Sequence, residues 1–119
     1  MAEITLKGSP VLTFGDLPAV GTQAPDFELT SIDLSEFGIK DVSGGTFILN
    51  IFPSLDTAVC AMSVRRFNME AAASPGVKVL CISADLPFAH GRFCETEGID
   101  NVVNLSSFRS PDFGRDYGV

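Results

Sequence analysis

Two apolar segments of strand length, joined by a helical pattern, constrain the fold of this chain more than any other feature. TFILNIF (residues 46–52) and VKVLCIS (residues 77–83) are nearly continuous apolar runs, as expected of buried central strands. Between them, from about residue 57 to residue 73, the apolar positions follow the period of a helix. A strand, a helix and a second strand at this spacing predict a βαβ unit with a mainly parallel sheet.

The flanking segments extend this α/β pattern in both directions. Residues 88–97 predict a second, shorter helix, and residues 102–105 predict a third parallel strand. Near the start, residues 3–15 alternate apolar and polar side chains around Gly8, Ser9 and Pro10, which predicts a β-hairpin. Residues 108–119 show neither a helical nor a strand pattern, so we expect the sequence to end without a closing element.

Length and composition limit both the domain count and the classes of partner. The 119 residues suffice for one domain, which we place at 1–119. A net charge of −7 with only eight basic residues argues against nucleic acid or an anionic membrane as the main partner. No secretory signal and no apolar segment of bilayer length is visible, and the odd number of cysteines indicates reduced thiols. We therefore expect a cytoplasmic protein.

The segment PSLDTAVC (residues 53–60) carries the strongest chemical signal. It follows a predicted strand directly, so Cys60 falls in the first turn of the next helix, where unpaired N–H groups and the helix dipole favour a thiolate. Ser54, Asp56 and Thr57 are all candidate caps of this helix. If Thr57 caps it, Cys60 is the third helical residue and the Thr57 hydroxyl lies over the sulfur. The alternative is that Cys60 is a packed core residue, but its position favours a nucleophile.

The charge that such a nucleophile needs is not evident nearby. A helix terminus contributes about 1 kcal/mol to the thiolate, and strongly activated cysteines usually have a cation beside them as well. Arg65 and Arg66 are predicted to lie on other faces of the helix. We therefore expect the activating charge to come from elsewhere in the fold, from another subunit or from residues absent from this sequence.

The remaining cysteines and the single histidine allow several interpretations. Cys81, inside a predicted strand, is interpreted as a packing residue. Cys94, in a polar helix between Gly91 and Gly98, is either an exposed and mobile thiol without a role or a resolving thiol that condenses with a sulfenic acid. His90 could join the cysteines, but zinc-site spacing is absent, so we expect no metal and no cofactor.

Several motifs together resemble the thiol peroxidase branch of the bacterial peroxiredoxins, which are atypical 2-Cys enzymes. The resemblance covers nearly the whole chain, and it implies a thioredoxin-like fold with an added N-terminal β-hairpin. The motifs that carry it are GTQAPDF (21–27), PSLDTAVC (53–60), SVRRFN (63–68), VLCISADLPFA (79–89), RFC (92–94), FR (108–109) and YGV (117–119).

The resemblance also implies a role for each site residue. Cys60 becomes the peroxidatic cysteine, Thr57 its hydrogen-bonding partner and Pro53 the residue that shields the pocket. Cys94 becomes the resolving cysteine, paired with Cys60 within one subunit, and Cys81 is not required. Members of the family reduce hydrogen peroxide and alkyl or lipid hydroperoxides, are recycled by thioredoxin, and form homodimers.

One departure from the family pattern concerns the C-terminus. The family continues past YGV into further strands, a closing helix and an arginine that contacts the peroxidatic cysteine, and none of these occurs in this sequence. Arg109 matches the arginine of the FR element near the dimer interface instead. We expect a peroxidase whose sequence is incomplete at the C-terminus. The alternative is a catalytically silent fragment that acts only through dimer or other protein contacts.

Overall fold

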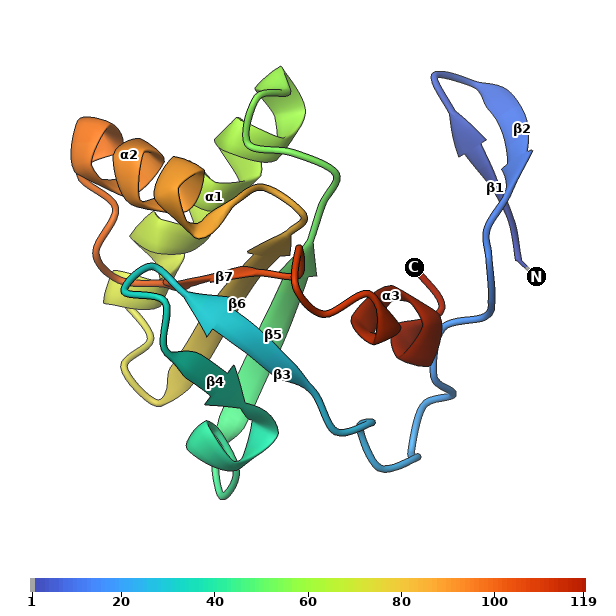
Figure 1. Ribbon diagram of the computed structural model, residues 1–119, viewed down its shortest axis with the longest axis horizontal. Coiled ribbons are helices and arrows are strands. Elements are labelled where there is room, and N and C mark those ends of the chain that lie inside the picture. Colours follow the sequence, from blue (N-terminus) through green and yellow to red (C-terminus); the bar gives the residue numbers. More distant parts are fainter. Residues whose placement is uncertain (1) are drawn as a thin grey trace.

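The centre of the molecule is a mixed sheet with helices on both faces. The computed structural model describes residues 2–119 and, within them, has a five-stranded sheet in the order β4-β3-β7-β6-β5 and a separate hairpin of β1 and β2 (Figure 1). The strands are β1 (Glu3–Leu6), β2 (Ser9–Leu12), β3 (Glu28–Ser31), β4 (Glu36–Gly38), β5 (Thr46–Ile51), β6 (Val77–Ser83) and β7 (Val103–Ser106). The helices are α1 (Ala58–Ala72), α2 (Pro87–Glu97) and α3 (Asp112–Tyr117), with a 3-10 turn at Ile39–Asp41.

The predicted parallel unit is confirmed. Strands β5, β6 and β7 pair in parallel, and α1 and α2 form the crossovers between them. The strand β3 pairs antiparallel with β7 on one side and with β4 on the other. The short β4 was not predicted, because three residues are too few for a periodic pattern.

The pleat of β6 divides the interior into two apolar clusters. Val79 and Cys81 point to the face that α1 and α2 cover, whereas Leu80 and Ile82 point to the opposite face. The first face contains a cluster that we call the helix-side cluster: Phe52, Leu55, Val64, Val79, Cys81 and Ile99. Because every residue of β6 from Val79 to Ser83 is buried, this strand reads as a continuous apolar run.

The last twelve residues were expected to be irregular, and this expectation is wrong. They contain α3, which starts after Pro111 and ends at Gly118 in the left-handed conformation (φ 70°). Phe113 and Tyr117 are spaced i, i+4 and are both buried against Phe27, so tertiary contacts stabilise a helix of only six residues. The Tyr117 hydroxyl also donates a hydrogen bond to the Pro25 carbonyl oxygen (2.6 Å).

The predicted N-terminal hairpin is confirmed, although its turn is one position earlier. Lys7 and Gly8 have positive φ angles (51° and 82°), so they form the two-residue turn, and Pro10 lies within β2. The hairpin stands away from the sheet (Figure 1). The segment after it packs closely on the end of α3, where the Asp16 backbone leaves no room for a side chain on Gly118.

None of the helices in residues 2–119 is long and apolar enough to cross a bilayer.

Candidate active site

Cys60 lies where the sequence places it, in the first turn of α1. Thr57 is the N-cap residue with extended backbone angles (φ −105°, ψ 142°), so Cys60 is the third helical residue. Its side chain is half-buried and packs against the helix-side cluster. The thiol therefore sits beside the free N–H groups that begin the helix, at the carboxyl end of β5.

Thr57 is the cap residue by backbone geometry, but its hydroxyl does not bond to the helix. It donates to the Ser54 carbonyl oxygen (2.9 Å), and the Thr57 backbone N–H donates to the same oxygen (3.2 Å). In this conformation the hydroxyl hydrogen is thus directed to the loop rather than to the Cys60 sulfur. Thr57 closes the loop before α1 and leaves the first turn of the helix open.

The loop before α1 is fixed to the neighbouring strand end by a carboxylate. Asp85, two residues after β6, accepts hydrogen bonds from the Ser54 hydroxyl (2.8 Å) and from the Leu55 backbone N–H (2.7 Å). The Ser54 hydroxyl oxygen also accepts from the Asp56 N–H (3.0 Å). These contacts hold the backbone that leads into Cys60. Ser54 was predicted only as a candidate cap, and no role was predicted for Asp85.

Pro53 is exposed and lines a hollow of about 320 Å³ at the carboxyl ends of β5 and β6. Its other walls come from both strand ends and from α3, and they are mainly apolar. The described lining does not include Thr57 or Cys60. Pro53 therefore lines this hollow, whereas Thr57 and Cys60 lie outside its described lining. The predicted site residues do not all line one cavity.

All three cysteines meet at the helix-side cluster. Cys81 is a member of it, and Cys60 and Cys94 pack against its edge from α1 and α2. All are free thiols. Burial raises the pKa of the Cys81 thiol from 9.0 to about 11, which agrees with its interpretation as a packing residue.

Cys94 is less accessible than the interpretation as an exposed, mobile thiol requires. It is half-buried, and burial raises the pKa of its thiol from 9.0 to about 11. Its carbonyl oxygen accepts hydrogen bonds from the N–H groups of Gly98 and Ile99, which close the end of α2. Cys94 therefore lies in the last turn of a packed helix, close to the point where that helix can fray.

The arginines of α1 are engaged away from Cys60, as predicted. Arg65 pairs with Glu97 of α2 (2.6 Å), and Arg66 pairs with Glu70 one turn further along α1 (3.0 Å). Arg109 is exposed and lines a separate hollow beside β3.

His90 does not take part in a cysteine cluster. It is fully buried in α2, and its Nε2 atom lies 2.9 Å from the Ser83 hydroxyl oxygen. Among the described residues, 2–119, no group of three or more His, Cys, Asp or Glu side chains is arranged to hold a metal ion.

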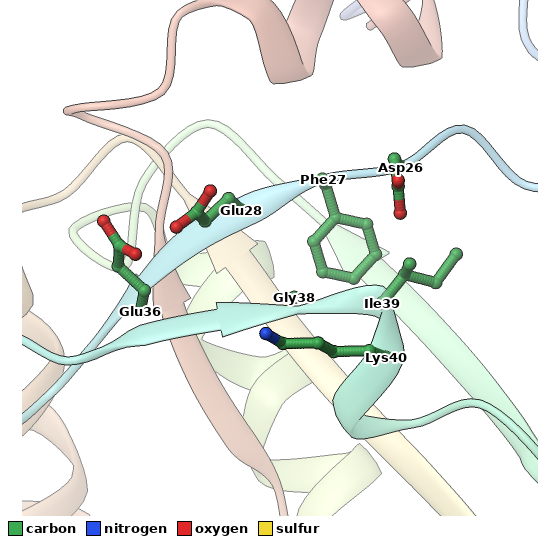
Figure 2. A pocket seen from close by; sticks show the side chains of 7 residues that line it. All are labelled: Asp26, Phe27, Glu28, Glu36, Gly38, Ile39 and Lys40. Atoms are coloured by element: carbon green, nitrogen blue, oxygen red, sulfur yellow. The ribbon is translucent and has the colours of Figure 1, made fainter.

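A surface hollow of about 490 Å³ is lined by residues of the β3–β4 pair and its flanking segments, and its lining includes no cysteine (Figure 2). The carboxylates of Glu28 and Glu36 lie close together on the neighbouring strands, and Lys40 lies further along the chain, after β4. A hydrogen bond and charge repulsion from Glu36 raise the pKa of the Glu28 carboxyl. The hollow has acidic groups but no nucleophile, so it is not a candidate for thiol chemistry.

Comparison with known proteins decides the family. A family model described as Redoxin matches residues 19–119. The chain belongs to the Redoxin family.

Individual relatives of this Redoxin indicate a particular branch of the family. It is 56% identical over 119 residues to a thiol peroxidase of Mycobacterium tuberculosis, covering all of this chain and 71% of that relative. It is 51% identical over 119 residues to a thiol peroxidase of Corynebacterium glutamicum, covering 72% of it. Among solved structures, a peroxiredoxin-like protein from Aquifex aeolicus superposes with a TM-score of 0.86 at 40% identity, over 98% of this chain and 68% of the other.

These relatives confirm three predictions. The fold is the thioredoxin-like peroxiredoxin fold, the branch is that of the thiol peroxidases, and the enzyme class is that of the thiol-dependent peroxidases.

The raised pKa values predict slow alkylation of Cys81 and Cys94 in this Redoxin. Because only the thiolate reacts, the alkylation rate of Cys94 by iodoacetamide should rise about tenfold per pH unit up to pH 10. Peptide mapping by mass spectrometry measures each site separately. A Cys94 rate that levels off near the ordinary pKa of 9.0 would contradict the burial of this thiol.

The same shifts give the sign of a stability change. Above pH 9 the unfolded chain releases thiol protons that the folded chain still holds, so the unfolding free energy should fall as pH rises from about 9 to about 11.

Proposed function

We propose that this Redoxin reduces hydrogen peroxide and alkyl or lipid hydroperoxides with Cys60 as the peroxidatic cysteine. The observation that carries the proposal is the position of Cys60, in the open first turn of α1 behind a loop that Asp85 and Thr57 hold in place. A thiol at a helix N-terminus is stabilised as the thiolate that attacks peroxides.

The proposed reaction has two steps. The Cys60 thiolate attacks one oxygen of the peroxide, an S–O bond forms, the O–O bond breaks, and the departing oxygen takes a proton to give water or an alcohol. Cys60 is then a sulfenic acid. Cys94 loses its proton and attacks the Cys60 sulfur as a thiolate, an S–S bond forms, the S–O bond breaks, and the departing hydroxide takes up a proton to give water. The common apolar cluster beneath Cys60 and Cys94 supports this pairing within one subunit.

In this proposal Thr57 and Pro53 assist the first step. Rotation of the Thr57 hydroxyl away from the Ser54 carbonyl would let it donate to the peroxide oxygen when substrate is bound. Pro53 lacks an N–H donor and lines the apolar hollow, so it would limit access of water to the loop. The apolar lining of this hollow also suits an alkyl chain.

Turnover requires a reductant, which we propose to be thioredoxin. A dithiol of this kind returns Cys60 and Cys94 to thiols by exchange and supplies the two electrons. We further propose a cytoplasmic location in a bacterium and a homodimer. Phe88 and Phe108 are strongly exposed (67% and 64%) just beyond the carboxyl ends of β6 and β7, which supports a protein contact on this edge.

One equivalent of peroxide followed by mass spectrometry tests the proposal. The expected result is a transient gain of one oxygen on Cys60, trapped by a sulfenic-acid reagent, followed by loss of two hydrogens as Cys60 and Cys94 join. A protein that consumes no peroxide and shows no change at Cys60 would contradict it and would favour the alternative of a silent protein that acts through contacts alone.

A further inference from the structure

The Asp85 carboxylate is the centre of a hydrogen-bond network between the two cysteine-bearing helices. One oxygen accepts from the Ser54 hydroxyl, and the other accepts from the Leu55 N–H (2.7 Å) and from the Ser83 hydroxyl (2.6 Å). The Ser106 hydroxyl donates to the Asp85 carbonyl oxygen. Asp85 thus connects the loop before α1 with the ends of β6 and β7.

The network continues into α2 through Ser83. The Ser83 hydroxyl has one hydrogen, which it donates to Asp85, so toward His90 it can only accept. His90 must therefore carry a hydrogen on Nε2 and donate it to Ser83 (2.9 Å). His90 is fully buried, and burial lowers the pKa of its imidazole although Asn104 and Asp85 oppose this effect. The bond to Ser83 fixes α2 one turn before Cys94.

The negative charge of Asp85 determines which groups donate hydrogen bonds in this network. Burial alone would raise the pKa of the Asp85 carboxyl, but its hydrogen bonds with Ser83, Leu55 and Ser54 outweigh burial, and the pKa is lowered. Hydrogen bonds to an ionised acceptor are the stronger kind. Asp85 is therefore held as a carboxylate that only accepts hydrogen bonds.

We infer that Asp85 is a positioning residue that clamps the Cys60 loop to the Cys94 helix and opposes the local unwinding that would bring the two cysteines together. The inference rests on the proposed function, because it assigns Cys60 and Cys94 to successive steps. A disulfide needs Cα atoms within about 7 Å, so one helix end must unwind before the second step. The clamp holds the start of α1 for peroxide attack and opposes that unwinding.

Substitution D85N separates these effects. It puts an amide donor where an acceptor is required, and it should slow peroxide attack by Cys60 about tenfold, the cost of one charge-assisted hydrogen bond. Formation of the Cys60–Cys94 disulfide from the sulfenic acid should become several-fold faster, because the loop and the start of α1 unwind more readily. Rapid quenching at successive times and mass spectrometry measure both rates in one experiment.

Matched controls separate a clamp from a general loss of stability. Substitution D33N removes the same charge from a carboxylate whose hydrogen bonds are with Ser35 and not with the Cys60 loop. Substitution Y117F removes one hydrogen bond from α3. Both should leave the ratio of the two rates unchanged. Hydrogen exchange at the Leu55 amide, which D85N alone should accelerate, gives a readout that does not depend on activity.

The outcomes distinguish failure of the clamp from failure of the proposed function. If the unsubstituted protein forms no sulfenic acid on Cys60, the proposed function is wrong. If it does, but D85N leaves both rates unchanged or slows both equally, the clamp is wrong. Should D85N fail to fold, substitution S54A is the second test, because it removes only one of the bonds to Asp85. It should slow peroxide attack and speed disulfide formation, each to a smaller extent than expected for D85N.

Discussion

Replacing Cys60 with serine is expected to abolish peroxide consumption, with a loss of about a thousandfold or more in rate. Serine keeps the size and position of the side chain, but its hydroxyl is not ionised at neutral pH and is a poor nucleophile toward an O–O bond. The rest of the site, including the bonds from the loop to Asp85, should be unaffected because none involves the sulfur. Coupled consumption of a thiol reductant and direct loss of hydrogen peroxide both measure the effect.

Cys81 offers a matched control for that experiment. It is a member of the cluster against which Cys60 packs, but it is fully buried within β6 rather than in the first turn of α1. Substitution C81A should lower the unfolding free energy by about 1 kcal/mol through the small cavity it leaves, with peroxide consumption retained. Full activity in the Cys60 variant, or loss of activity only in the Cys81 variant, would show that Cys60 is not the nucleophile.

Periodic segments made much of the fold predictable. The apolar runs at 46–52 and 77–83 and the helical spacing between them correspond to β5, β6 and α1 within about one residue at each end. The helix α3 was not predictable in the same way. Its two core residues, Phe113 and Tyr117, flank Gly114 in six residues, and only contact with Phe27, far away in the sequence, shows that they form a helix.

The site was predictable only where its features are local. The position of Cys60 in the first turn of α1 follows from its place just after a strand, and the structure confirms it. The hydrogen bonds from Ser54 and Leu55 to Asp85 cross 30 residues or more of sequence, and no periodicity indicates them. A usable signal did exist, because the ends of parallel strands meet at one edge, and Asp85 follows β6 as Ser54 follows β5.

The direction of the Thr57 hydroxyl illustrates the same limit at atomic scale. Thr57 is one of three candidate caps in the sequence, and the structure makes it the N-cap residue. Spacing does not reveal that the Ser54 carbonyl oxygen competes for the hydroxyl hydrogen, since this depends on the turn that the loop adopts.

Substitution C94S is expected to leave the first reaction step intact and to stop the enzyme after about one turnover per chain. Cys60 would still become a sulfenic acid, but no nearby thiol would be placed to condense with it. Cys81 is an unsuitable substitute, because it is buried in β6 and its pKa of about 11 keeps it protonated. The measurement is a burst of peroxide consumption equal to the concentration of Cys60, followed by no consumption with thioredoxin as the reductant.

The same experiment tests how burial regulates Cys94. In the closed helix its thiol is protonated, with a pKa near 11, so it does not react prematurely. In the proposed mechanism, unwinding of the last turn of α2 would expose it to water, which would return the pKa of the Cys94 thiol toward its ordinary value and make the thiolate available for the second step. Excess peroxide should therefore oxidise Cys60 beyond the sulfenic acid more readily in C94S than in the unsubstituted protein. Continued cycling of C94S with thioredoxin alone would show instead that Cys94 is not the resolving cysteine.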